Sequence, residues 1–325
     1  MRNNTNANST VTSMVSASGV TPWFEDAIVL PKQGVIDRVA FTASGQDWNV
    51  DRKPIMVVGG NEIPDFFAVV RSDTQEALGV VGKDFRELQN WEMYEIGNSL
   101  VTEGQAVYET AGVLGNGHKV WCMLKLPADF DVVKGDKVES YVTICNSHDG
   151  QSKLRIFPTA IRAVSKATLN IAIKRETNIV AVKHTQGMQE RIKTVHEVLR
   201  IVRDEFGEMM AASKFLAKKK LSTQQVDNFI KAILPVLNTG KKVSNKTTSI
   251  KTKLLGFYEY GTGNDIPAVK GSAWAMFNGV CEYVDYQRPT RTFVGDTAAH
   301  QRAEALLFKG GQEMKQQAFD ILMKI

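Results

Sequence analysis

The hydrophobic pattern of this chain changes its period near residue 176. Before that point, short apolar runs alternate with turn residues, which is typical of β-strands. Beyond it, apolar residues recur at alternating steps of four and three, the spacing of a helix with one apolar face. These residues are Met188, Ile192, Val195, Leu199, Val202, Phe206 and Met209. The pattern predicts an α+β fold, with an antiparallel meander sheet and helices followed by a largely helical C-terminal half.

The composition is that of a folding chain, with 43% hydrophobic and 23% charged residues among 325. Residues 1–21 are the exception, because Asn, Ser and Thr dominate them, and we expect a disordered arm there. We expect residues 22–176 to form an α+β sheet domain. Residues 177–325 are predicted to be a mainly helical, basic region packed on it.

Local signals place the turns and several helices. Gly115-Asn116-Gly117 and the tetrapeptide His148–Gln151 each separate two apolar runs, which predicts two β-hairpins. Helices are expected at about residues 34–41, 91–103 and 161–174. A further helix should follow a capping box formed by Ser222 and Gln225 and should end before Pro235. The heptad stripe predicts one long helix, packed within the chain rather than in a free coiled coil.

The cysteines and the apolar runs limit the cellular context. Cys122, Cys145 and Cys281 are widely spaced and lie in apolar surroundings, so we expect buried free thiols rather than disulfides or a zinc site. No apolar run approaches the roughly 20 residues that a membrane-spanning helix needs. We therefore expect no membrane association and a cytoplasmic location, in a bacterial host cytosol.

Positive charge is concentrated in one part of the chain. Residues 183–253 hold 15 Lys and Arg against 6 Asp and Glu, a local net charge of +9 where the whole chain carries +5. A surface that binds polyanions has this character, because lysine and arginine contacts to phosphates release condensed counterions. A solvated helical face would carry the same charges, so both interpretations stay open.

We expect a set of basic residues to line one groove for nucleic acid. The set is Arg155, Arg162, Lys166, Lys174, Arg175, Lys218, Lys219, Lys220, Lys241 and Lys242. Four aromatic residues close to them in sequence could stack on bases, as single-strand binding requires, or could belong to the core. They are Phe157, Phe257, Tyr258 and Tyr260.

The segment His148-Asp149-Gly150 has two interpretations. As a turn, it uses the aspartate as a cap and the glycine for its permissive backbone. As a site, His148 and Asp149 could act with an acid such as Glu109 in a metal-assisted nuclease or hydrolase. Because neighbours on a strand point to opposite faces, we favour the turn. No histidine or cysteine spacing predicts a metal, no glycine-rich motif predicts a nucleotide, and we assign no catalytic residue or cofactor.

An ordered series of motifs resembles a known family. The series includes DWNVDRKPI, VVRSDTQEALGVVGKDFRELQN, EGQAVYETAGVLGNGHKVWCMLKLP, ESYVTICNSHDGQSKLR, TAIRAVSKATLN and GSAWAMFNGVCEYVDYQRPTR. It is similar to the phage/plasmid-like family known only as a domain of unknown function, over about residues 23–325. Where members read Arg-Val-Val-Cys-x-Asn-Thr-Leu, this chain has Ser165 and Ala167 at the Cys and Asn positions. A role that needed that thiol or amide is in doubt here.

The resemblance implies a place in phage or plasmid DNA metabolism. A meander followed by a helix also resembles the core of single-strand annealing proteins, which bind DNA in a basic groove of an oligomeric ring. We therefore expect an accessory protein that binds nucleic acid non-specifically, single-stranded DNA above all, in strand annealing or recombination and without turnover chemistry. The analogy also allows a homo-oligomer. The alternatives are the metal-assisted enzyme and a protein-interaction module that acts through the heptad helix.

Overall fold

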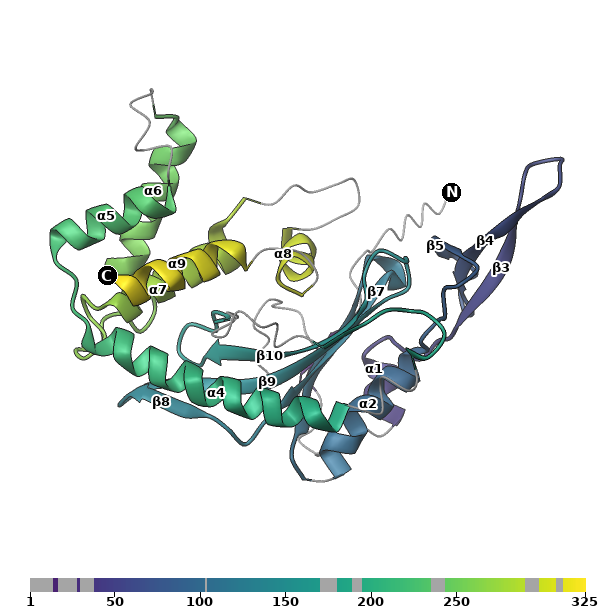
Figure 1. Ribbon diagram of the computed structural model, residues 1–325, viewed down its shortest axis with the longest axis horizontal. Helices are drawn as coiled ribbons and strands as arrows, with labels where there is room; N and C mark the ends of the chain where they lie inside the picture. The colour runs from purple at the N-terminus through teal and green to yellow at the C-terminus, as the bar shows by residue number, and fades with distance from the viewer. Residues whose placement is uncertain are drawn as a thin grey trace, which may run out of the picture.

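A sheet of eight strands, mostly antiparallel, forms the centre of the protein (Figure 1). The computed structural model describes residues 14–16, 28–29, 38–102, 104–169, 180–188, 195–234, 243–289, 298–307 and 312–325. The strand order is β11-β10-β9-β7-β6-β1-β2, and β8 pairs with β9. The strands are β1 (Met14–Ser16), β2 (Ile28–Val29), β6 (Val107–Leu114), β7 (Lys119–Lys125), β8 (Phe130–Val133), β9 (Asp136–Ser147), β10 (Leu154–Arg162) and β11 (Val180–Val182). The predicted α+β class and the meander are confirmed.

Both predicted hairpin turns form where the sequence placed them. Gly115–Gly117 joins β6 to β7, and Asn116 adopts a positive φ of 56°, which asparagine tolerates better than most residues. The second turn joins β9 to β10, which pair from Arg155 with Cys145 to Arg162 with Val138. Local turn chemistry therefore fixes the register of the central strands.

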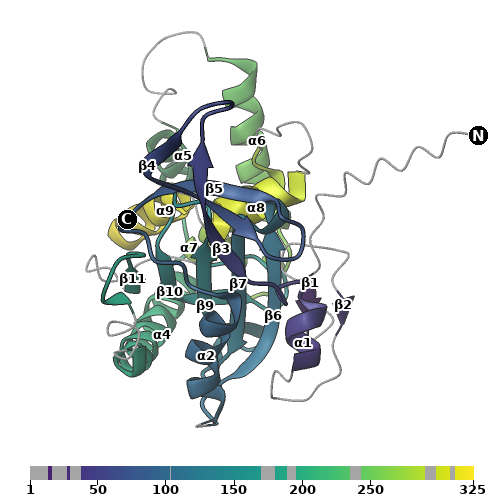
Figure 2. The same cartoon turned by 90° about the vertical axis from the view of Figure 1, so that its right-hand side faces the viewer.

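Three further strands form a second, smaller antiparallel sheet. They are β3 (Val50–Met56), β4 (Glu62–Arg71) and β5 (Ala77–Gly82), in the order β3-β4-β5. The hairpin of β3 and β4 extends away from the rest of the protein in Figure 1, and in Figure 2 it is seen in front of the central sheet. We call these three strands and their connections, residues 50–82, the arm.

The central sheet is covered on both faces, which explains the unbroken apolar run of β7. Val120, Cys122 and Leu124 belong to the main buried cluster, together with side chains of helix α2 (Asn90–Thr102). The alternate residues of β7, Trp121 and Met123, belong to a second cluster with Ala303 and Leu307 of helix α8 (Ala298–Leu307). The α2 helix confirms the prediction for residues 91–103 as far as the described residues extend.

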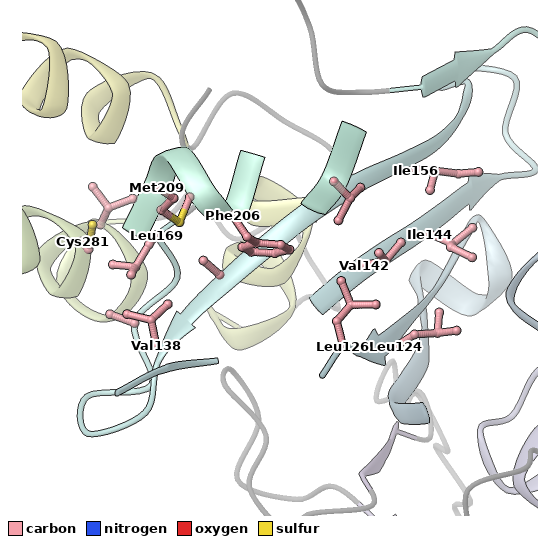
Figure 3. Close-up of a cluster of buried hydrophobic side chains, with 14 of the residues drawn as sticks. Leu124, Leu126, Val138, Val142, Ile144, Ile156, Leu169, Phe206, Met209 and Cys281 are labelled. Carbon is pink, nitrogen blue, oxygen red and sulfur yellow. The ribbon is translucent and has the colours of Figure 1, made fainter. Parts of the chain in front are cut away.

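From Val195 onward the heptad stripe forms one long helix, α4 (Val195–Lys218), as predicted, while residues 189–194, with Ile192 of the stripe, lie outside the described residues. This helix contacts β8 and β10, and its Val202, Phe206 and Met209 are buried. Figure 3 shows Phe206 and Met209 directed toward the sheet residues Val138 and Val142. The main cluster joins side chains from the sheet and from the helical region, so the two predicted regions share one core.

The remaining helices complete the C-terminal half. They are α5 (Thr223–Ile233), α6 (Asn245–Tyr260), α7 (Ala273–Glu282), which continues as the π-helical turn η3 (Tyr283–Gln287), and α9 (Glu313–Lys324). The capping box of α5 is confirmed, since Ser222 Oγ accepts from Gln225 N at 3.3 Å and Gln225 Oε1 accepts from Ser222 N at 2.9 Å. No helix in the described ranges is long and apolar enough to cross a membrane.

The helix predicted at residues 161–174 is wrong for the part that the structure describes. Ile161 and Arg162 end strand β10, a turn follows, and Ile161 forms an isolated bridge with Thr168. Asp285 accounts for the difference, because its Oδ2 accepts from both the backbone N (2.7 Å) and the Oγ1 (2.9 Å) of Thr168. This contact is remote in sequence, and it removes a donor that a helix would have used. Residues 170–174 lie outside the described residues.

The N-terminal segments differ in part from the predictions. Met14–Ser16 lie within residues 1–21, which we predicted to be disordered. They form β1 and pair with β6, so these three residues are a strand. The other residues of 1–21 lie outside the described residues. Helix α1 spans Arg38–Ala43, which overlaps the C-terminal part of the helix predicted at 34–41; residues 34–37 are not described. The three cysteines are buried and free, as predicted.

A fully buried ion pair fixes the last helix to the sheet. Lys315 of α9 has no exposed surface, and its Nζ forms an ion pair with Asp285 of η3. The same Nζ donates to the carbonyl oxygen of Thr168 at 2.8 Å and to its Oγ1 at 2.6 Å. Three segments that are distant in sequence therefore meet at one ammonium group.

We expect Lys315→Met to lower the free energy of unfolding by about 3–5 kcal/mol, since it leaves Asp285 as a buried charge without its cation. Urea denaturation measures the change. Lys324→Met is the matched control, because Lys324 lies on the same helix and is exposed, and it should change stability by less than about 0.5 kcal/mol. Equal effects of the two substitutions would contradict this role of Lys315.

Candidate nucleic-acid interface

The C-terminal end of α4 presents lysines to solvent. The helix buries Leu216 and Ala217 against the core, whereas Lys214 and Lys218, four residues apart, are exposed on its outer side. Residues at this spacing are neighbours on a helix surface. Two positive charges therefore lie side by side at the helix end, where cations also interact favourably with the helix dipole.

A short connection before α7 is held against this helix end. Lys220 forms an isolated bridge with Ser272, and Ala273 N donates to Lys219 O at 2.8 Å. The Lys220 Nζ donates to the carbonyl oxygens of Ala268 (3.0 Å) and Lys270 (2.7 Å). These bonds bring the exposed Lys270 to the lysines of α4. We call Lys214, Lys218, Lys219, Lys220 and Lys270 the lysine cluster.

An exposed aromatic ring belongs to the same surface. The side chain of Phe215 is 47% exposed, although phenylalanine is usually buried. The Lys219 Nζ lies 5.4 Å from the centroid of its ring, a cation–π arrangement. The surface therefore combines positive charge with an accessible aromatic ring, as single-strand binding surfaces do.

The charge of the lysine cluster is not balanced locally. Within the described part of the chain, no acidic side chain forms an ion pair with any of its five lysines. Lys231 of α5 differs, since its Nζ lies 2.6 Å from Asp227 Oδ2. The cluster therefore keeps a local positive field, which attracts anions.

Arg162, which we predicted to bind nucleic acid, is instead a structural residue. It is fully buried, and its guanidinium binds both carboxylate oxygens of Asp136, with Nε to Oδ1 at 2.7 Å and Nη2 to Oδ2 at 3.0 Å. Its Nη1 donates to Thr262 O at 2.9 Å and to Asn264 Oδ1 at 3.0 Å. No phosphate can reach this side chain in the folded protein.

The other predicted basic residues do not join the lysine cluster through any described contact. Arg155 is half-buried, with Nη1 donating to Leu307 O at 3.2 Å. The Lys166 Nζ lies 3.7 Å from Glu139 Oε2. Lys218, Lys219 and Lys220 do belong to the cluster. Lys174, Arg175, Lys241 and Lys242 lie outside the described residues.

The predicted stacking aromatics are mostly packed into the fold. Phe157 is 3% exposed, and Phe257 and Tyr258 are half-buried against the main cluster. Tyr260 is 83% exposed at the end of α6. Phe215 was not among the aromatic residues that we predicted to stack on bases, although its position off the heptad stripe and beside a lysine was a usable signal.

His148 and Asp149 have different hydrogen-bond partners, as expected for a turn. The buried His148 Nε2 donates to Asn90 Oδ1 at 2.8 Å, and burial, helped by the charges of nearby His184 and His118, lowers its pKa to about 3. Asp149 Oδ1 accepts from Gln151 N at 2.9 Å, and Gly150 has a φ of 73°. The structural turn is confirmed.

The three residues of the alternative enzyme site are not brought together. Glu109 is close enough to Tyr141 to help raise its pKa, and Tyr141 precedes His148 by seven residues along the same strand and turn. At about 3.3 Å per residue this separates Glu109 from His148 by roughly 20 Å. Among the described residues, no group of three or more His, Cys, Asp or Glu side chains could hold a metal ion.

Comparison with known proteins finds one family. The family model described as a domain of unknown function, DUF932, matches residues 77–307, which include β5 of the arm, the central strands from β6 onward, α4 and the lysine cluster. No curated protein and no solved structure matches the chain.

The buried His148 should make stability depend on pH. Between its ordinary pKa of 6.5 and its folded value of about 3, the unfolded chain binds a proton that the folded chain does not, so stability falls as pH decreases through this window. Between neutral pH and about pH 5.5, the free energy of unfolding of the wild type should fall by roughly 1 kcal/mol more than that of the His148→Gln variant. The glutamine keeps a donor for Asn90. Urea denaturation at both pH values tests this, and equal losses would contradict it.

Proposed function

This chain belongs to the DUF932 family, a domain of unknown function, and we propose that it binds single-stranded nucleic acid through the lysine cluster and Phe215. The binding is non-specific in sequence and involves no turnover reaction. The observation that carries the proposal is a group of lysines on one helix end that have no ion-pair partner among the described residues and lie beside an exposed aromatic ring.

The lysines supply affinity through phosphates. A lysine that contacts a phosphate releases condensed counterions, and the gain in entropy is the main source of non-specific affinity. Lys214, Lys218 and Lys270 serve this role best, because they are exposed and, among the described residues, none of their side chains donates a hydrogen bond. Lys220 holds the connection before α7 in place, and so its contribution is to position Lys270.

Phe215 supplies the preference for single strands. Every base has an aromatic face, but in a duplex these faces are covered by stacked neighbours. A side chain that is 47% exposed on a helix can stack on a base only when that base is unstacked from at least one neighbour. In phage or plasmid DNA metabolism, a surface that neutralises phosphates and leaves base edges free would support strand annealing or recombination.

A protein-interaction module that acts through the heptad helix would need an apolar face that is free to bind a partner. That face would be the apolar stripe of α4. In the structure the stripe residues Val202, Phe206 and Met209 are buried against the chain's own sheet and helices. The outer face of α4 near its end carries Lys214 and Lys218, which suits an anionic ligand better than an apolar one.

We expect the triple variant Lys214→Gln, Lys218→Gln, Lys270→Gln to bind a labelled oligothymidine much more weakly at low salt. Because each phosphate contact contributes about 0.7 to the slope of log K against log salt for single strands, loss of three contacts should make the slope shallower by roughly 2. Fluorescence anisotropy titrations at several salt concentrations measure both quantities.

The control is a triple variant that removes equal charge elsewhere, Lys134→Gln, Lys153→Gln, Lys324→Gln. These three lysines are exposed and lie outside the cluster. The control should keep the wild-type slope. Wild-type protein that does not bind at low salt, or equal slopes for the two triple variants, would refute the proposal.

We expect Phe215→Ala to weaken binding by about 1–3 kcal/mol without changing the salt slope, because stacking does not release counterions. Duplex DNA of equal length should be bound equally by the variant and by the wild type. Tyr260→Ala is the matched control, since it removes another exposed ring that lies outside the lysine cluster. Comparable losses from both substitutions would show that Phe215 has no special position.

A further inference from the structure

The arm exposes apolar side chains that its own chain does not cover. Phe66 on β4 is 50% exposed and Val80 on β5 is 60% exposed. Ala68 pairs with Val80, and residues two apart on a strand share a face, so Phe66 and Val80 lie on the same face. The hairpin tip adds Met56 and Val58, which are 66% and 102% exposed. Apolar side chains gathered in this way usually mark an interaction surface.

The two edges of the arm differ in how they are protected. The edge strand β3 carries Lys53, Pro54 and a bulge after Pro54, all of which hinder pairing with another strand. The other edge strand, β5, reads Ala-Leu-Gly-Val-Val-Gly, with no charge and no proline. The turn between β9 and β10 packs closely against Gly79, and no strand among the described residues occupies the outer edge of β5, which can take a further strand.

The charges on the arm indicate what kind of partner fits. Residues 54–64, which form its outer part, contain one charged residue, Glu62. A negative charge on an apolar hairpin is unfavourable for binding to phosphates or to an anionic lipid surface. The partner of the arm is therefore a protein rather than nucleic acid or membrane.

The ends of β5 carry opposite charges. Glu76 precedes the strand and Lys83 follows it, and both side chains are exposed. When two copies of this strand pair antiparallel, Lys83 of each copy lies near Glu76 of the other, at both ends of the pairing. Opposite charges across a strand pair are favourable, whereas parallel pairing would oppose like charges. The strand is thus complementary to itself in the antiparallel direction alone.

We propose that two copies of this chain associate through antiparallel pairing of their β5 strands. The two arms then form one continuous six-stranded sheet around a two-fold axis. Phe66 and Val80 of one copy lie beside the same residues of the other and lose their exposure to water. Because the strands run in opposite directions, the hairpin tip of each arm, with Met56 and Val58, is directed toward the body of the partner.

The first experiment measures mass in solution by sedimentation at high micromolar concentration. The full chain of 36.0 kDa should sediment as a dimer, and Val80→Lys should be monomeric, because it places two like charges beside the axis. Val164→Lys is the control, since Val164 is 40% exposed and lies away from the arm in sequence, in the turn after β10; it should remain dimeric. A monomeric wild type, or a dimeric Val80→Lys, would overturn the proposal.

The second experiment exchanges the charges at the ends of β5. Lys83→Glu and Glu76→Lys should each raise the dissociation constant several-fold, because each places like charges together twice. The double variant should return it toward the wild-type value. Within the chain, Lys83 Nζ lies 3.3 Å from Asp65 Oδ2, and Glu76 Oε1 accepts from Asn116 Nδ2 at 3.1 Å; the double variant restores neither contact. Recovery therefore reports pairing between copies, and failure to recover would refute the antiparallel arrangement.

Discussion

Two fully buried ion pairs hold the helical half of this protein on its sheet. Asp136 and Arg162 come from neighbouring central strands, and Trp274 Nε1 of α7 donates to the same carboxylate at 2.8 Å. Asp285 and Lys315 join η3 to α9. A buried charge without its partner costs several kcal/mol, so each of these charges is stable in the core only beside its partner. They set the position of α7 and, through the connection before it, of Lys270 beside α4.

Burial also divides the positive charge of the chain into two functional groups. Arg162 and Lys315 are fully buried and serve the fold, whereas the lysine cluster is exposed and has no described ion-pair partner. In the sequence both groups are only cationic residues near apolar ones. What separates them is whether a carboxylate from a distant segment is available, such as Asp136 for Arg162. This is why charge counting could not show that Arg162 is a buried structural residue rather than an exposed one.

The same distinction explains which features the sequence could predict. The turn at Gly115–Gly117, the capping box at Ser222 and the α4 helix depend on contacts within a few residues, and all three are confirmed. The helix expected from residue 161 is wrong because Asp285 accepts the donors of Thr168 from 117 residues away. Lys270 reaches the lysine cluster only through a bridge between Lys220 and Ser272. Long-range polar contacts therefore limited the prediction of both the fold and the site.

The dimer that we propose would alter how the lysine cluster acts on a long strand. Each copy carries one cluster at the end of α4, and the arm extends from a different part of the protein (Figure 1). A dimer formed through the arms carries two such clusters, one on each copy. A strand bound at one cluster then meets the second at a high effective concentration, which raises the overall affinity without any new contact. Short oligonucleotides that cannot span the two clusters do not gain this additional affinity. The dependence of affinity on oligonucleotide length therefore connects nucleic-acid binding by the lysine cluster with pairing of the arms.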